Sequence, residues 1–218
     1  MNHLVVFAKE PVAGRVKTRL ARTLGEGPAT SLYAAFLEDL AAGLGDVRAA
    51  RSVATHEEEP GPVLERIFAG WTFVPQGEGG LGVRLARVSA HAFSAGASRV
   101  VIVGSDAPAL SAADVEGAFA RLLEAQVSFA PSPDGGYALV GLASPDLAKA
   151  FESPIRWSTP HALEDSVEAF SALGARAELL PQIADVDEEE DLGALLAFLE
   201  SHPGRAPRTL EALKVRAA

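Results

Sequence analysis

The sequence contains no cysteine, and this absence removes several kinds of chemistry at once. Disulfide bonds, thiolate nucleophiles and zinc sites built on cysteine are all excluded. No stretch approaches the ~20 apolar residues of a membrane span, and the short apolar N-terminal run has no basic region before it. We therefore expect a cytoplasmic protein with neither a membrane span nor a secretory signal.

Positive charge is scarce as well. The 218 residues include 19 Lys and Arg against 29 Asp and Glu, and the formal net charge is -10. Such a balance argues against a general nucleic-acid-binding protein, which needs a basic surface. The sequence also has no G-x-x-x-x-G-K-[ST] phosphate loop, no G-x-S-x-G nucleophile elbow and no H-E-x-x-H zinc motif. What remains is an ordinary globular composition, and the length favours a single domain.

Apolar runs alternate with amphipathic segments, which predicts strands alternating with helices. Strands are expected at 3–8, 51–56, 71–76, 98–106 and 176–182, and helices at 28–44, 79–96, 159–173 and 188–201. A further helix opens at Ser111 with Asp114 as its capping partner. Residues 126–142 predict a hairpin with a tight turn at Asp134. The fold class is therefore α/β, a mixed, mostly parallel sheet flanked by helices, with one domain over 1–202 and a loosely tied tail over 203–218.

Ligands of such sheets bind at the carboxyl ends of the strands, so the residues after each strand are the candidates. These segments are 9–19, 76–84, 104–108 and 131–137. The first carries four cations, Lys9, Arg15, Lys17 and Arg19. Pro11 and Gly14 impose an irregular path, and a helical pattern starts at Lys17, so the loop can cradle phosphates. The alternative is a solvated basic surface, which is how we interpret Arg22, one turn further on.

Carboxylates follow two of the strands. Asp106 comes directly after "VVIVGS" and is a candidate ligand for Mg²⁺ or Mn²⁺, which take one or two carboxylates together with phosphate oxygens; the alternative is a turn residue before Pro108. Asp185 and Asp187 are both open as the second ligand. Asp187 also fits a helix N-cap with Glu190 as its capping-box partner, and the neighbouring glutamates suit the first turn of a helix.

Other residues at the same edge could contact a substrate. The turn of Asp134, Gly135 and Gly136 with Tyr137 allows a ligand to approach the backbone, although a plain hairpin explains the glycines. "QGEGGLGVRL" is a weak phosphate loop that leads to Arg84. His161 could act as a base, although a lone histidine near a helix start is more often structural, and Trp157 is more often a packing residue.

Together, these motifs resemble one family over about residues 3–200. A basic loop ending in K-T-R-L, "GSDAP", "PDGGYALVGL", the Trp157 segment and "DVDEEEDL" are similar to DUF2064, a family of nucleotide-diphospho-sugar transferase-like proteins with the GT-A fold. Some members are arsenosugar-biosynthesis-type glycosyltransferases. The wider superfamily includes the molybdenum-cofactor and phospholactate guanylyltransferases.

The resemblance implies a GT-A domain that binds a nucleotide or nucleotide sugar, a divalent metal (Mg²⁺ or Mn²⁺) and a small-molecule acceptor. It places phosphates at Ala8, Lys9, Gly14, Arg15, Lys17 and Arg19, and the base and ribose beside Gly80, Gly82 and Arg84. Asp106 and Asp187 would hold the metal. Asp134, Gly135, Gly136, Tyr137 and Trp157 would face the sugar or acceptor. The implied catalytic residues are Asp106, Lys17, Asp134 and Asp187.

The sequence departs from its relatives at two motifs. The nucleotidyltransferase branch opens with A-G-G-x-[GS]-x-R, whereas this chain has A-K-E-P-V-A-G-R. "GSDAP" lacks the second aspartate of a full D-x-D motif.

Three functions remain open at this point. The first is glycosyl transfer from a nucleotide-diphosphate sugar, with Asp134, Asp187 or His161 as base. The second is nucleotidyl transfer, in which an acceptor phosphate attacks the α-phosphorus of an NTP and pyrophosphate leaves. The third is a nucleotide-binding module without catalysis.

Overall fold

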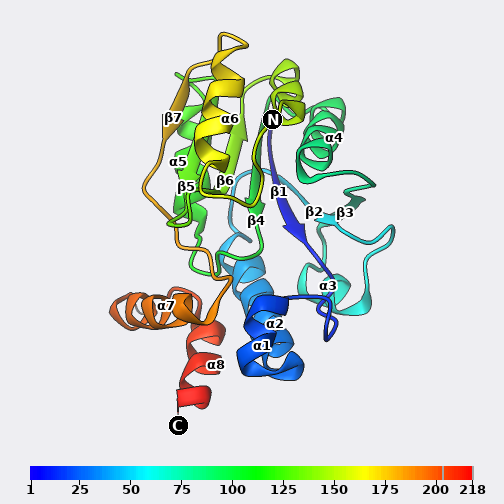
Figure 1. Cartoon of the computed structure of the whole chain (residues 1–218). Coiled ribbons are helices and arrows are strands. Elements are labelled where there is room, and N and C mark those ends of the chain that lie inside the picture. The colour runs from blue at the N-terminus through cyan, green and yellow to red at the C-terminus, as the bar shows by residue number, and fades with distance from the viewer. Residues whose placement is uncertain (203, 218) are drawn as a thin grey trace.

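Seven strands form one sheet within the part of the chain that the computed structural model describes, residues 1–202 and 204–217 (Figure 1). Their order across the sheet is β3-β2-β1-β4-β6-β5-β7. The bounds are β1 (Asn2–Ala8), β2 (Ala50–Thr55), β3 (Thr72–Pro75), β4 (Arg99–Gly104), β5 (Val127–Pro131), β6 (Tyr137–Leu142) and β7 (Ala177–Leu179). The predicted hairpin is the β5–β6 pair, and β6 runs antiparallel to both of its neighbours. The remaining pairs are parallel, so the predicted mixed, mostly parallel sheet is confirmed.

Helices cover both faces of the sheet. The α-helices are α1 (Thr18–Leu24), α2 (Glu26–Gly43), α3 (Pro62–Ile67), α4 (Leu81–Ser94), α5 (Ala112–Arg121), α6 (Ala162–Ser171), α7 (Glu189–Ser201) and α8 (Pro207–Ala217), and η1 (Pro145–Glu152) is a 3-10 helix. The described residues include no helix long and apolar enough to cross a bilayer.

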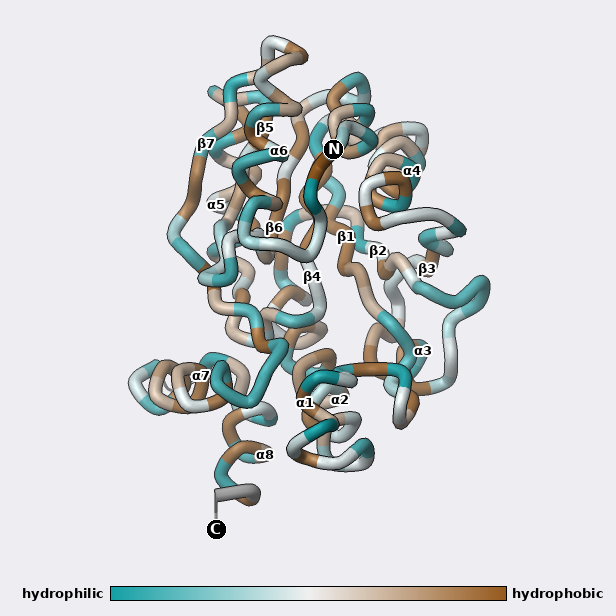
Figure 2. Tube along the Cα trace, in the orientation of Figure 1, coloured by the Kyte–Doolittle hydropathy of each residue, from teal (hydrophilic) through white to brown (hydrophobic). Residues whose placement is uncertain are grey.

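The alternation of side chains along β1 separates two cores. Leu4 and Val6 face the helices α1, α2, α3, α5, α7 and α8, whereas Val5 faces α4, η1 and α6. This follows from the two-residue period of a strand, which sends successive side chains to opposite faces. In Figure 2 the apolar colouring follows β1, while the segment that leads into α7 is hydrophilic. A strand buried on both faces carries a continuous apolar run, which is why the sequence identified it.

Two helix starts test the capping predictions. Ser111 caps α5 and Asp114 closes the capping box, as predicted. For α7 the predicted pair of Asp187 and Glu190 is wrong, because the N-cap is Glu188 and its backbone N–H donates to the Asp191 carboxylate over 2.8 Å. The true pair lies one residue later, which frees the Asp187 carboxylate from the cap.

The C-terminal residues are more firmly held than the sequence predicted. Residues 207–217 form α8 instead of a loose tail, and α8 packs on α2 and α7. The carboxylate of Asp39, which is almost fully buried on α2, accepts the backbone N–H groups of Arg208 (3.2 Å) and Thr209 (2.7 Å) at the start of α8. This is an N-cap supplied by another helix, and it satisfies donors that a helix start otherwise leaves unpaired. Pro203 lies outside the described residues.

Candidate functional site

Two adjoining cavities lie at the edge of the sheet where β1 and β4 end and where the β5–β6 turn connects its two strands. The larger, of about 430 Å³, is lined mainly by the first loop, α4 and the end of β4. The smaller, of about 240 Å³, is lined mainly by β6, the β5–β6 turn and residues 157–159. They share Phe7, Arg19, Leu81, Gly104, Tyr137 and Asp187. One ligand can therefore extend from one cavity into the other.

The larger cavity is basic. Lys9, Arg15, Lys17, Arg19 and Arg84 line it, against the two carboxylates Asp106 and Asp187. Ala8, at the end of β1, lines it as well. The first-loop cations predicted to meet phosphates thus lie on one cavity, whereas Arg22 is exposed on α1 and is not among the described lining residues.

Tyr33 of α2 fixes the start of the first loop. Its hydroxyl accepts the backbone N–H of Lys9 over 3.1 Å and lies 3.0 Å from the Ser105 hydroxyl. Burial, then the nearby Asp106 carboxylate, raises the pKa of Tyr33, so the hydroxyl keeps its proton. Sequence reasoning missed Tyr33, because its place in the apolar pattern of α2 makes it look like an ordinary core residue.

Glu10 fixes the same loop from the other side. Its side chain is buried and accepts the backbone N–H groups of Val63 (3.0 Å) and Leu64 (3.1 Å) in the first turn of α3. A Cβ on Gly61 would overlap the Glu10 carboxylate, so a glycine leaves room for this contact. The glutamate in "AKEP" is thus a helix cap supplied from a distance, and nothing in its local sequence signals that role.

Replacing Glu10 with glutamine should destabilise the fold by about 2 kcal/mol, because an amide cannot accept both N–H groups as a carboxylate does and leaves one buried donor poorly paired. Urea unfolding measures the change. The control is Glu65→Gln, which removes an exposed carboxylate from the same helix. If the two substitutions change the free energy of unfolding equally, the hydrogen bonds of Glu10 contribute nothing to stability beyond the charge of the carboxylate.

Lys17 lies at the centre of the site. It adopts the left-handed conformation (φ 46°) just before α1, and its side chain is only 4% exposed. Its ammonium group donates to the Val186 carbonyl over 2.5 Å, pairs with Asp106, and lies 3.5 Å from Asp187 Oδ1. One cation thus joins the first loop, the end of β4 and the segment before α7.

The other cations have separate partners. Arg19 Nη1 lies 3.7 Å from both Asp187 and Glu188. Arg84 donates to the buried Gln76 side chain over 2.8 Å, and its Nε is buried without a partner. A buried donor without a partner is uncommon in folded proteins, and Arg84 itself lines the larger cavity.

The three glycines predicted at the nucleotide each have a different structural position. Gly14, with φ +76°, occupies a turn, and Gly80 precedes the first residue of α4. Gly82 is buried, and a Cβ there would overlap the Phe151 carbonyl. Among the described residues, none of these three lines either cavity.

Asp106 and Asp187 fit a metal that takes part of its coordination from a ligand. Both carboxylates are about half exposed, at 46% and 48%, and both approach the Lys17 ammonium. Their oxygen donors suit Mg²⁺ or Mn²⁺. Within residues 1–202 and 204–217, no three His, Cys, Asp or Glu side chains gather closely enough to hold a metal by themselves. A cation here would therefore need phosphate oxygens as further ligands.

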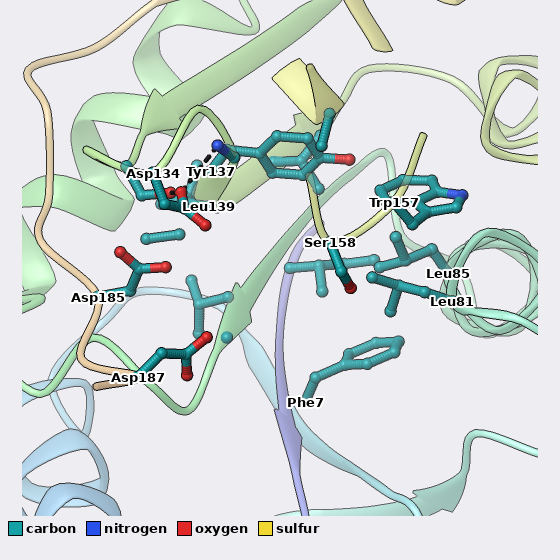
Figure 3. A pocket seen from close by; sticks show the side chains of 18 of the residues that line it. Phe7, Leu81, Leu85, Asp134, Tyr137, Leu139, Trp157, Ser158, Asp185 and Asp187 are labelled. Atoms are coloured by element: carbon teal, nitrogen blue, oxygen red, sulfur yellow. Dashed lines mark hydrogen bonds between the residues drawn. The ribbon is translucent and has the colours of Figure 1, made fainter. Parts of the chain in front are cut away.

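The smaller cavity combines carboxylates with aromatic side chains. Figure 3 shows Asp134, Asp185 and Asp187 along one side, and Tyr137, Trp157, Leu81 and Leu85 toward the other. Tyr137 and Trp157 make an edge contact with ring centroids 6.3 Å apart. Burial raises the pKa of Tyr137, so its hydroxyl remains protonated beside Ser166.

The β5–β6 turn fixes the Asp134 carboxylate. Its Oδ1 accepts the Ser132 hydroxyl (2.5 Å) and the Gly136 N–H (2.8 Å). Gly135 has φ +86°, and a Cβ there would overlap Pro160. The glycines therefore serve the turn itself and the docking of the segment before α6.

Asp185 faces the same cavity. Burial, followed by the nearby Asp134, Asp187 and Asp106 carboxylates, raises its pKa to about 6. Burial is thus the main reason why a negative charge on Asp185 is costly, and the neighbouring carboxylates add to that cost. His161, by contrast, lies at the exposed start of α6, 3.5 Å from Glu164, and is not among the described residues that line either cavity.

Comparison with known proteins gives two sequence relationships. A model of the family described as uncharacterized proteins conserved in bacteria (DUF2064) matches residues 40–159. The phosphoenolpyruvate guanylyltransferase of Conexibacter woesei is 30% identical over 207 residues, which cover 88% of this chain and 87% of that protein.

Solved structures show the same architecture. A candidate nucleotide-diphospho-sugar transferase from Desulfovibrio desulfuricans has a TM-score of 0.91 and 28% identity, with 99% of this chain and 95% of that chain covered. The 2-C-methyl-D-erythritol 4-phosphate cytidylyltransferase of Thermus thermophilus has a TM-score of 0.56 and 17% identity, with 92% and 100% covered, and this likeness concerns the fold alone. The predicted nucleotide-diphospho-sugar transferase fold is confirmed. The predicted transferase class agrees with the names of the Desulfovibrio desulfuricans and Conexibacter woesei proteins.

Proposed function

Because the chain belongs to the DUF2064 family and has the nucleotide-diphospho-sugar transferase fold, we propose that it transfers a sugar from a nucleotide-diphosphate sugar to a hydroxyl group of a small acceptor. The observation that carries the proposal is that two adjoining cavities differ in their lining: cations predominate in one, and carboxylates and aromatic rings in the other. The basic cavity suits a diphosphate, and the cavity with carboxylates and aromatic rings suits a sugar. Residues 1–202 form the catalytic domain in this proposal.

The basic cavity would hold the nucleotide and stabilise the leaving group. In the transfer, the bond between the sugar C1 and the diphosphate oxygen breaks, and the electron pair leaves with the nucleoside diphosphate. Lys9, Arg15, Lys17 and Arg19 would stabilise the developing charge, which is the main electrostatic demand of this step. Arg84, which lines the same cavity from α4, would contact the nucleoside end.

Asp106 and Asp187 would hold Mg²⁺ or Mn²⁺ together with the diphosphate. When bound, the ion supplies further positive charge to the leaving group. The ammonium of Lys17 already lies between these two carboxylates, so the pair is positioned before any substrate arrives.

Asp134 would accept the proton of the acceptor hydroxyl as its oxygen forms the new bond to C1. One carboxylate oxygen is fixed by Ser132 and Gly136, which orients the other. Asp187 is engaged by Lys17 and Arg19, and His161 lies at an exposed position outside the described cavity linings. Gly135, Gly136, Tyr137 and Trp157 would contact the sugar or the acceptor.

Nucleotidyl transfer is the second candidate, because the guanylyltransferase of Conexibacter woesei is 30% identical over most of the chain. The cations of the first loop would also suit a triphosphate. The charge of the smaller cavity argues against a phosphorylated acceptor, since Asp134, Asp185 and Asp187 would repel an anion and Arg19 is the one cation among the described residues lining it.

A thermal-shift experiment separates these candidates. UDP- or GDP-sugars, or NTPs, are added with and without Mg²⁺ or Mn²⁺. A nucleotide sugar at about 100 times its Kd should raise stability by about 2.7 kcal/mol, a shift of roughly 5–10 °C for a chain of this size. Stabilisation by NTPs alone, with pyrophosphate released when a phosphorylated acceptor is added, would support the second candidate instead.

Asp106→Asn should abolish the metal-dependent part of this shift, because it removes one of two charged ligands. The control is Asp46→Asn, an exposed aspartate in the turn after α2. If Asp106→Asn and the parent respond alike to the metal, Asp106 does not hold it. If no nucleotide stabilises the protein, the whole site assignment fails.

A further inference from the structure

A third cavity lies away from the candidate site, at the amino ends of β2 and β3. It has a volume of about 550 Å³, and none of its described lining residues is shared with the other two. Arg51 at the start of β2, Arg66 of α3 and Arg208 of α8 line it, together with Glu38 and Trp71. We call it the arginine groove.

Three guanidinium groups thus converge in a chain whose net charge is -10. Glu38 opposes two of them, since its Oε1 lies 3.2 Å from Arg66 Nη1 and its Oε2 lies 3.3 Å from Arg208 Nε. Asp39 is 3.6 Å from Arg208, but its carboxylate is buried and already accepts the two backbone N–H groups of α8. The lining itself therefore carries more positive than negative charge.

The guanidinium groups are held in place by contacts that leave donors available. Arg51 donates to the Gly45 carbonyl and stacks over Trp71, with its central carbon 5.4 Å from the ring centroid. Arg66 contacts Glu38 through Nη1 alone. A guanidinium has five N–H donors, so both side chains keep several for a ligand. Because the two side chains are already ordered, less side-chain conformational entropy is lost when a ligand binds.

We propose that the arginine groove binds a small molecule bearing phosphate groups, at a site separate from the nucleotide cavity. Planar guanidinium groups match phosphate oxygens with paired hydrogen bonds. The volume lies within the range of about 300–1,000 Å³ typical of small-molecule sites. Apart from Ile67, the rest of the described wall consists of small residues that leave that space open, namely Ala41, Ala42, Gly45, Ala69 and Gly70.

Occupancy of the groove would also act on α8. Arg208 belongs to α8, Arg66 to α3 and Glu38 to α2, so a bound phosphate would bridge helices that meet at this point. The groove is complete only when Asp39 holds α8 in place.

The two tryptophans of the chain give a direct test, because Trp157 lines the candidate site and Trp71 lines the arginine groove. The Trp157→Phe protein has Trp71 as its one tryptophan. Inorganic pyrophosphate is added to this protein while its fluorescence is recorded. We expect a saturable change at micromolar to millimolar concentrations.

Adding Arg66→Gln should raise the Kd for pyrophosphate in this titration by about tenfold or more, since it removes a charged donor. Arg66 is mostly exposed, so this variant should keep its fold, and circular dichroism verifies that. The matched control removes a cation from the other cavity: Arg15→Gln should leave the Trp71 response unchanged. Absence of a saturable change, or an equal response in the Arg66→Gln protein, would overturn the proposal; loss of the response in Arg15→Gln would place pyrophosphate in the nucleotide cavity instead.

Discussion

Replacing Lys17 with methionine should weaken binding of a nucleotide-diphosphate sugar by roughly 10²–10³-fold while changing the free energy of unfolding by only about 1–2 kcal/mol. The side chain that carries this ammonium is only 4% exposed, and the ammonium approaches both proposed metal ligands. Its loss leaves Asp106 and Asp187 without this partner, but both are about half exposed, so water can solvate them. Methionine fills a similar volume with an apolar chain, although it loses the contacts of the ammonium with the Tyr33 and Phe36 rings.

Calorimetric titration measures the affinity, and urea unfolding measures the stability. Arg22→Gln is the matched control, because it removes one positive charge from an exposed position in α1, the helix that follows Lys17. We expect its affinity to equal that of the parent. If the Lys17→Met protein binds within a few fold of the parent, the ammonium does not contact the diphosphate.

Gly82→Ala should destabilise the fold by about 3 kcal/mol or more. An added Cβ would overlap the carbonyl oxygen of Phe151 in η1 and would lie 3.0 Å from Trp157 Nε1. Relief requires α4 and η1 to move apart, because the overlapping atom belongs to the backbone. The displaced Trp157 would also disturb the smaller cavity, so we expect weaker ligand binding as well.

Gly193→Ala is the control with the opposite sign. Gly193 lies inside α7, and a Cβ there meets nothing within 4 Å. Alanine is favoured over glycine in a helix, so this variant should gain about 0.5–1 kcal/mol. Urea midpoints at constant m-value compare the two. A Gly82→Ala protein as stable as the parent would mean that α4 and η1 leave room for a Cβ beside the Phe151 carbonyl.

The sequence could predict the strand ends because buried strands leave a local signal. The runs ending at Ala8 and Gly104 are apolar on both faces, and the fold rule then places Lys9 to Arg19 and Asp106 at one edge. Residues from distant segments could not be found in this way. Tyr33 and Glu10 act through contacts with residues 24 and 53–54 positions away in the chain, and their own neighbours carry no trace of these contacts.

The cap of α7 shows a different limit. Carboxylates fill positions 187–191, so a spacing of three residues fits Asp187 with Glu190 and Glu188 with Asp191 equally well. The choice is made by tertiary structure: the buried Val186 donates its N–H to the Asp106 carbonyl over 2.9 Å, which fixes the segment before the helix. Likewise, the docking of α8 depends on a buried aspartate, Asp39, within a helix whose pattern otherwise indicates only an apolar face.

The contact between Lys17 and Val186 spans 169 residues, and this has a consequence for synthesis. A ribosome adds roughly 5–20 residues per second, so the ammonium of a nascent chain waits on the order of ten seconds for the segment that holds it. Until then β1, β2 and β4 can pair, but the basic loop lacks its contacts with the segment around Val186. The proposed ligand-binding surface is therefore incomplete until residues 185–188 have been synthesised, and a chain released before then would carry the basic loop with Asp106 but without Asp187 as a partner of Lys17.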